Sequence, residues 1–106
     1  MALSKSIIDE ISKISEDYVI NDVNDGIQII IKTRQPELMV SIIKSKHIYC
    51  CRYGMYEACL MKGNDVNAGG MHLYTKEMPD VITLTADQIV QFVRDVNFGI
   101  YGTVIN

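Results

Sequence analysis

Apolar and charged residues near the N-terminus alternate with the period of an amphipathic helix. The charged positions fall on one side, and the apolar stripe opposite consists of Ile7, Ile8, Ile11, Ile14 and Tyr18. Either Ser4 or Ser6 can cap such a helix, because a hydroxyl oxygen accepts a hydrogen bond from a first-turn N–H that has no partner inside the helix. The pattern predicts a helix over residues 4–16.

Two runs rich in β-branched residues follow and predict a hairpin. The runs are Tyr18–Val23 and Ile27–Thr33, and Asn24-Asp25-Gly26 lies between them. Asp-Gly between such runs favours a tight turn, because glycine readily adopts the positive φ that the turn requires. Alternation in the second strand places Gln28, Ile30 and Lys32 on one face and the remaining isoleucines on the other, namely Ile27, Ile29 and Ile31.

The middle of the chain is predicted to form further strands of an antiparallel sheet. Pro36 ends the second strand, since proline donates no hydrogen bond to a ladder. The predicted strands after it are Leu38–Lys44, His47–Tyr53 and Met55–Lys62. In the last of these, Tyr56, Ala58 and Leu60 point one way, and the opposite face carries Met55, Glu57, Cys59 and Met61. A flexible loop over 63–70 is expected next, and residues 71–84 read as partly extended.

A second helix is predicted after Thr85. Thr85-Ala86-Asp87-Gln88 is a capping box, in which the Thr85 hydroxyl and the Gln88 side chain each satisfy a backbone N–H of the other residue. A helical stripe follows, formed by Ile89, Val90, Phe92, Val93 and Val96. The helix is expected to end near Asn97 and Gly99, and the tail Ile100–Ile105 to add an edge strand.

Together these elements predict an α+β fold made of one domain, residues 1–106. An N-terminal helix precedes an antiparallel β-meander of four to five strands, and a C-terminal helix packs on one face of the sheet. The short connections argue against a parallel sheet, which requires long crossovers. The second sheet face is expected to be partly exposed and to carry the function.

Composition and cysteine usage indicate the class of protein and its expected cellular location. Of 106 residues, 48% are hydrophobic and 22% are charged, which is typical of a globular domain rather than a disordered chain. No apolar run is long enough to cross a membrane, and the first residues lack the apolar core of a secretory signal. The three cysteines are odd in number, whereas a small secreted domain usually pairs them all. We therefore expect a cytoplasmic protein.

Charge is distributed unevenly along the chain. Residues 31–63 contain six Lys or Arg against two Glu, whereas the remainder contains four basic residues against eleven acidic ones. The basic middle predicts a recognition surface composed of Lys44, Lys46, Tyr49, Arg52 and Tyr53. The acidic residues of the first quarter could instead imitate nucleic acid or engage a basic protein, although such charges more often form only a solvated face.

No motif for catalysis or for metal binding was found. His47, Cys50, Cys51, Cys59 and His72 lack the spacing of a zinc site. Cys51 beside Arg52 is the best candidate nucleophile, but His47 would lie about 13 Å away along an extended strand. The loop over 63–70 fits neither a phosphate-binding loop nor a calcium loop. We expect no catalytic residue, no metal and no cofactor.

The leading hypothesis is a small non-enzymatic module that binds a protein partner and that could also self-associate. Its compact and motif-free sequence is typical of accessory or inhibitor proteins encoded by viruses and mobile elements. Two alternatives stay open: an accessory protein that binds nucleic acid through a basic aromatic sheet face, and a cysteine-dependent enzyme. The overall acidity of the chain argues against the first alternative, since affinity for nucleic acid depends largely on neutralising phosphates.

Overall fold

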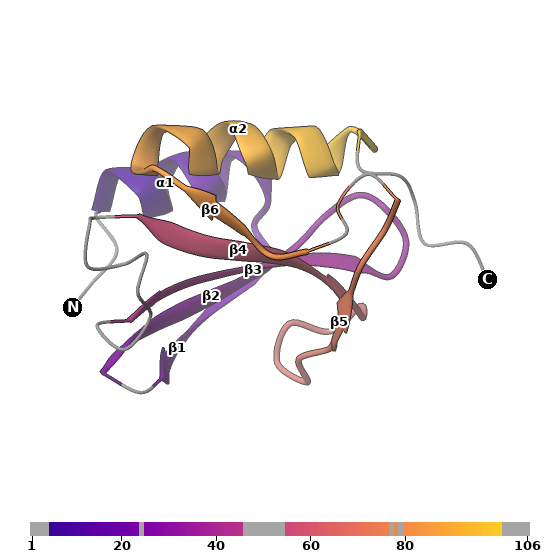
Figure 1. The fold of residues 1–106 in the computed structure, drawn as a ribbon, viewed down its shortest axis with the longest axis horizontal. Helices are drawn as coiled ribbons and strands as arrows, with labels where there is room; N and C mark the ends of the chain where they lie inside the picture. The colour runs from indigo at the N-terminus through magenta and orange to yellow at the C-terminus, as the bar shows by residue number, and fades with distance from the viewer. Residues whose placement is uncertain (1–4, 24, 46–54, 77, 79, 101–106) are drawn as a thin grey trace.

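The computed structural model describes residues 5–23, 25–45, 55–76, 78 and 80–100, and it has the α+β architecture that the sequence predicts (Figure 1). Two helices and six strands occur within these residues. In chain order they are α1 (Lys5–Ile14), β1 (Tyr18–Val23), β2 (Gly26–Lys32), β3 (Leu38–Ser45), β4 (Tyr56–Lys62), β5 (Met71–Leu73), β6 (Ile82–Leu84) and α2 (Ala86–Asn97). Neither described helix is both long and apolar enough to span a lipid bilayer.

The sheet is antiparallel and runs in the order β1-β2-β3-β4-β5. β6 also pairs with β4, so that two short strands share the outer edge of one long strand. Leu73 of β5 lies opposite Leu60, whereas Leu84 of β6 lies opposite Tyr56 at the other end of β4. The predicted strand His47–Tyr53 and nearly all of the predicted tail strand lie outside the described residues.

Both helices cover the same face of the sheet (Figure 1). The predicted alternation is confirmed, because Ile29 and Ile31 of β2 pack toward the helices and Ile30 packs on the opposite face. Met78, from the connection between β5 and β6, joins buried side chains of both helices and the three longest strands in the main core. The core consists of Ile7, Ile11, Ile29, Ile31, Leu38, Val40, Ile42, Tyr56, Ala58, Leu60, Met78, Ile89, Phe92, Val93 and Val96. This burial is the main stabilising contribution to the fold.

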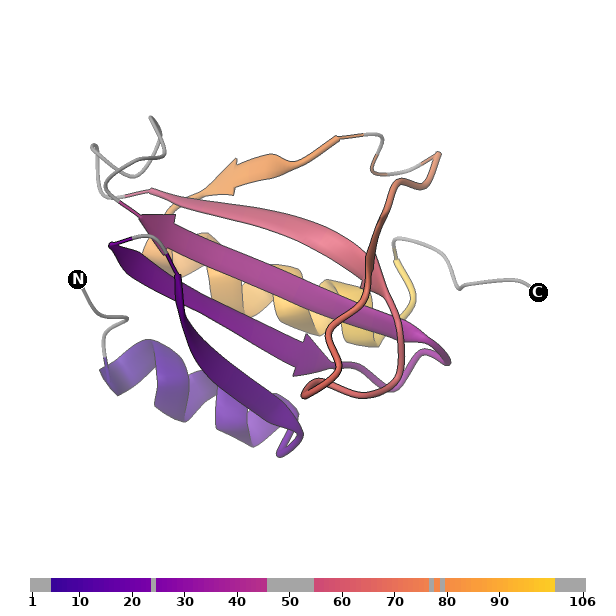
Figure 2. The ribbon, with the colours of Figure 1, turned by 90° about the horizontal axis from the view of Figure 1, so that it is seen from below.

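The face without helices, seen in front in Figure 2, has a second and smaller apolar cluster. Met39 is fully buried, and Ile30, Cys59 and Met61 are at most 5% exposed. Val66, from the connection between β4 and β5, packs on this cluster and is itself buried. The centre of this face is therefore not an open surface, although the sequence had suggested partial exposure.

The hairpin between β1 and β2 forms where the sequence predicts it, but the role assigned to its glycine was wrong. Val23 pairs with Gly26, and Asp25 lies in the turn between the two strands. The positive φ belongs to Asp25, at 52°, and not to Gly26. Glycine is needed at position 26 for a different reason, because a Cβ there would lie 2.1 Å from the carbonyl oxygen of Lys44.

The second helix begins as predicted. Thr85 is its N-cap residue with an extended backbone, and it forms a capping box with Gln88. The backbone N–H of Thr85 donates to the side-chain oxygen of Gln88 at 2.9 Å. The residues expected to be buried are buried: Ile89, Phe92, Val93 and Val96.

Candidate functional site

Only part of the predicted basic aromatic surface can be placed. Lys46, Tyr49, Arg52 and Tyr53 lie outside the described residues. Lys44 pairs with Ile27 and therefore lies on the helix side of the sheet, where its ammonium group is 4.7 Å from the ring centre of Tyr56. This cation–π contact lets Lys44 cover the edge of the core. The joint surface of these five residues stays a prediction.

The described cysteine is poorly suited to nucleophilic chemistry. Cys59 is buried on the face without helices. Burial raises the pKa of the Cys59 thiol, and the nearby charge of Glu57 raises it further, while a hydrogen bond with Ser41 acts in the opposite direction. The reactive thiolate is therefore disfavoured at neutral pH. His47, Cys50 and Cys51 lie outside the described residues, and within the part that is described no group of three His, Cys, Asp or Glu side chains could hold a metal ion.

A surface that sequence reasoning missed lies where the C-terminal ends of α1, β2 and α2 meet. Two adjoining hollows of about 210 and 180 Å³ open there, and both are lined by Ile14, Arg34 and Asn97. Basic residues from α1, from α2 and from the end of β2 with its following connection line them. We define the helix-end surface as Lys13, Lys32, Arg34, Arg94, Asn97 and Phe98.

Asn97 connects the end of α2 to the segment that follows β2. Its side chain is buried at the last residue of α2, and its Oδ1 accepts a hydrogen bond from the backbone N–H of Arg34 at 2.7 Å. Its carbonyl oxygen accepts a second bond, from the side-chain amide of Gln35 at 2.9 Å. On the other side of Arg34, the Thr33 hydroxyl donates to the Leu38 carbonyl at 2.8 Å. These bonds fix the start of the β2–β3 connection against the end of α2, so the position of Arg34 is set by the scaffold.

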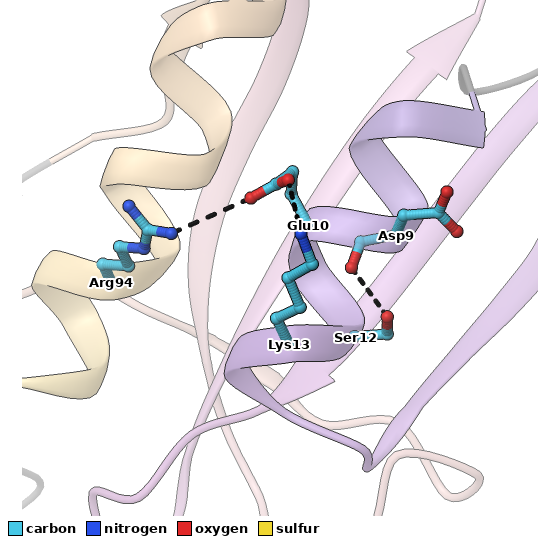
Figure 3. A network of polar contacts seen from close by, with 5 residues as sticks. All are labelled: Asp9, Glu10, Ser12, Lys13 and Arg94. Atoms are coloured by element: carbon cyan, nitrogen blue, oxygen red, sulfur yellow. Dashed lines mark hydrogen bonds and ion pairs between the residues drawn. The ribbon is translucent and has the colours of Figure 1, made fainter.

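The four cations of the helix-end surface differ in how far they are neutralised. Glu10 accepts a hydrogen bond from Lys13 at 3.0 Å and forms an ion pair with Arg94 at 3.8 Å across the two helices (Figure 3). Lys13, and to a smaller extent Arg94, hold the pKa of Glu10 below its ordinary value. For the side chains of Lys32 and Arg34, no hydrogen bond or ion pair occurs among the described residues, and Asp17 is the one carboxylate in the lining of the hollows. Positive charge therefore predominates on this surface.

An exposed apolar group adjoins these cations. The side chain of Phe98 is 72% exposed and that of Ile100 is 60% exposed. The turn that presents them is fixed by backbone hydrogen bonds from Phe98 to Arg94 and from Ile100 to Asp95, each of 3.0 Å, and by Gly99 with a φ of +83°. The helix ends near Asn97 and Gly99 as predicted. A clue was available in the sequence, because Phe98 directly follows the helix and lies outside its buried stripe.

No protein-family model matches the chain, and no match was found among curated proteins or solved structures. Function must therefore be argued from the chemistry of the surfaces.

Proposed function

We propose that the chain is a non-enzymatic protein-interaction module whose helix-end surface binds an acidic partner protein. The observation that carries the proposal is the position of Phe98, which is 72% exposed and lines the same hollow as Arg34 and Arg94. Aromatic residues and arginine are enriched at protein interfaces, where a few side chains supply most of the binding energy. A rigid aromatic anchor flanked by arginines is therefore suited to this role.

The charge of the surface favours an acidic partner. Four basic residues belong to this surface, and the carboxylates near them are Glu10 and Asp17. Its electrostatic field is therefore positive, although the whole chain has a net charge of −3. Such a field steers oppositely charged partners and excludes basic ones. Phosphate could satisfy the same cations, but the two carboxylates and the overall acidity disfavour nucleic acid as the partner.

Site-specific photo-crosslinking tests the partner class. A photoreactive phenylalanine analogue replaces Phe98 in the intact chain, which is expressed in its native host and irradiated. The matched control carries the analogue at Tyr74, which is 52% exposed and lies beyond the short strand β5. We expect an adduct at position 98 that is absent at position 74 and that protease removes. An adduct degraded by nuclease would favour the nucleic-acid alternative, and an adduct with the chain itself would indicate self-association.

Binding kinetics with the captured protein then test the electrostatic part of the proposal. Arg34→Glu should slow association by roughly three- to tenfold at low ionic strength, and added salt should reduce the difference. Lys76→Glu is the matched control, since Lys76 is also exposed but does not line either hollow. Equal association rates for the two variants would contradict the proposal. Phe98→Ala should mainly accelerate dissociation, because a buried anchor acts on the lifetime of a complex.

A further inference from the structure

The strand β1 lies at one edge of the sheet and pairs on one side only, with β2. The backbone N–H of Lys32 donates to the carbonyl of Asp17 at 2.9 Å. This bond shows which residues of β1 form hydrogen bonds with β2 and which do not. In an antiparallel pair, hydrogen-bonded residues alternate with residues whose backbone groups point outward. Tyr18, Ile20 and Asp22 are therefore the residues that direct their N–H and C=O groups away from β2. Within the described part of the chain, no hydrogen bond reaches these outward groups.

This edge has few of the features that normally prevent strand addition. Natural edge strands are often short, or they carry lysine, proline or a bulge. β5 and β6 fit that description at the opposite edge, since each has three residues. β1 has six residues without lysine, proline or glycine, and all six pair in continuous register with β2. Its central side chain, Ile20, is 42% exposed.

The charges along β1 indicate what kind of strand could pair with it. Residues 14–31 contain four carboxylates and neither Lys nor Arg. Glu16 and Asp17 precede the strand, Asp22 lies near its end, and Asp25 lies in the turn; all four are exposed. A second copy of the chain that paired through its own β1 would bring four further carboxylates to the interface between the two strands. Like charges across such an interface destabilise strand pairs. A strand with basic residues would instead be attracted.

We propose that the β1 edge binds an extended, Lys- or Arg-rich segment of a partner protein by strand addition. The outward N–H and C=O groups of Tyr18, Ile20 and Asp22 would form the new ladder, as in other cases of β-augmentation. The exposed Ile20 side chain would contact an apolar residue at the middle of the segment. Asp17 and Asp22 lie about 17 Å apart along an extended strand, so the cations of the segment should flank its apolar centre with that separation.

This site differs in charge from the helix-end surface of the proposed function, and of the residues used here it shares only Asp17 with the lining of the hollows. The helix-end surface attracts acidic groups through exposed cations, whereas the β1 edge offers backbone hydrogen bonds between carboxylates. Loss of one therefore does not predict loss of the other, and each can be tested alone.

The test uses the full chain and three synthetic peptides of six residues, so that the end residues of a paired peptide lie opposite Asp17 and Asp22. The first has Lys at both ends with alternating Thr and Val between them; the second has Glu at both ends. The third repeats the first but is N-methylated on alternate residues, which keeps its charge and removes its ability to form a ladder. Amide hydrogen exchange is followed by NMR. We expect the basic peptide alone to slow exchange at Tyr18, Ile20 and Asp22 by at least roughly tenfold, relative to Val19 and Asn21, which already face β2.

A matched pair of charge reversals completes the test. Asp22→Lys should weaken binding of the basic peptide by roughly three- to tenfold. Asp87→Lys should leave it unchanged. Asp87 is exposed in the first turn of α2, which follows β6, and β6 lies at the edge of the sheet opposite β1. Phe98→Ala should also leave it unchanged, which separates this result from that of the helix-end surface.

Three results would overturn the proposal. The first is equal binding of the basic peptide and its N-methylated form, which would show attraction by charge without a ladder. The second is no slowing of exchange at the outward amides when the basic peptide is present at millimolar concentration. The third is slow exchange at those amides without any peptide, together with a dimer in sedimentation, which would assign the edge to a second copy of the chain.

Discussion

Replacing Asn97 tests whether the helix-end surface depends on the contact that joins α2 to the β2–β3 connection. In Asn97→Ala the backbone N–H of Arg34 loses its acceptor at 2.7 Å. A partly buried donor left without a partner costs about 1–3 kcal/mol, whereas alanine in place of asparagine in a helix returns up to about 0.6 kcal/mol. We expect a net loss of about 1–2 kcal/mol, which for a domain of this size lowers Tm by roughly 5–15 °C.

Urea unfolding at neutral pH and thermal unfolding measure this loss, and Asn97→Asp is the matched control. Aspartate keeps an oxygen at the position of Oδ1, and its negative charge lies among the cations of the helix-end surface. Its stability should lie between those of the original chain and Asn97→Ala, because the retained acceptor offsets the cost of a charge that is buried at the negative end of α2. The reasoning is refuted if Asn97→Ala costs less than about 0.3 kcal/mol, or if aspartate costs as much as alanine.

Four further substitutions test the local structure. Thr85→Ala should cost about 1 kcal/mol in urea unfolding through the lost cap, and no loss would refute the assigned capping box. Gly26→Ala should cost about 1–3 kcal/mol in the same assay, because its Cβ would meet backbone atoms; Gly69→Ala, with open space but a φ of +72°, should cost about 1 kcal/mol through strain alone. Glu10 has a lowered pKa, so its pairing with Lys13 stabilises the fold above pH 4.5 and is lost as pH falls through the lowered value. The stability difference from Glu10→Gln should therefore shrink on acidification, and a difference that grows would contradict the ion pairs.

The parts of the fold that were predictable depend on contacts within one strand or one helical turn. Alternation assigned Ile29 and Ile30 to opposite faces because successive residues of any strand point to opposite sides. The start of α2 was predictable because a capping box is complete within four residues, from Thr85 to Gln88. In both cases, the signal and the structure lie in the same short segment.

The parts that were not predictable depend on contacts between distant segments. The role of Gly26 is set by the backbone of Lys44, on the neighbouring strand, and an Asp-Gly pair does not show which of its residues takes the positive φ. The helix-end surface depends on a hydrogen bond between Arg34 and Asn97, which are 63 positions apart. No local pattern indicates that the ends of two helices and a strand will meet there.

The fold also changes how the uneven charge of the chain should be interpreted. The helix-end surface takes Lys32 and Arg34 from the basic middle, but it takes Lys13 and Arg94 from the acidic flanks. Four carboxylates of the first quarter lie instead along β1 and its flanks: Glu16, Asp17, Asp22 and Asp25. Asp17 lies where the two surfaces meet, because it lines one hollow and its carbonyl accepts a hydrogen bond from β2 just before β1. Because surfaces of opposite charge lie side by side, this end of the molecule has a local electric dipole although the net charge of the chain is small. An approaching partner would be oriented by this local field at distances within about 10 Å, where screening by salt is incomplete.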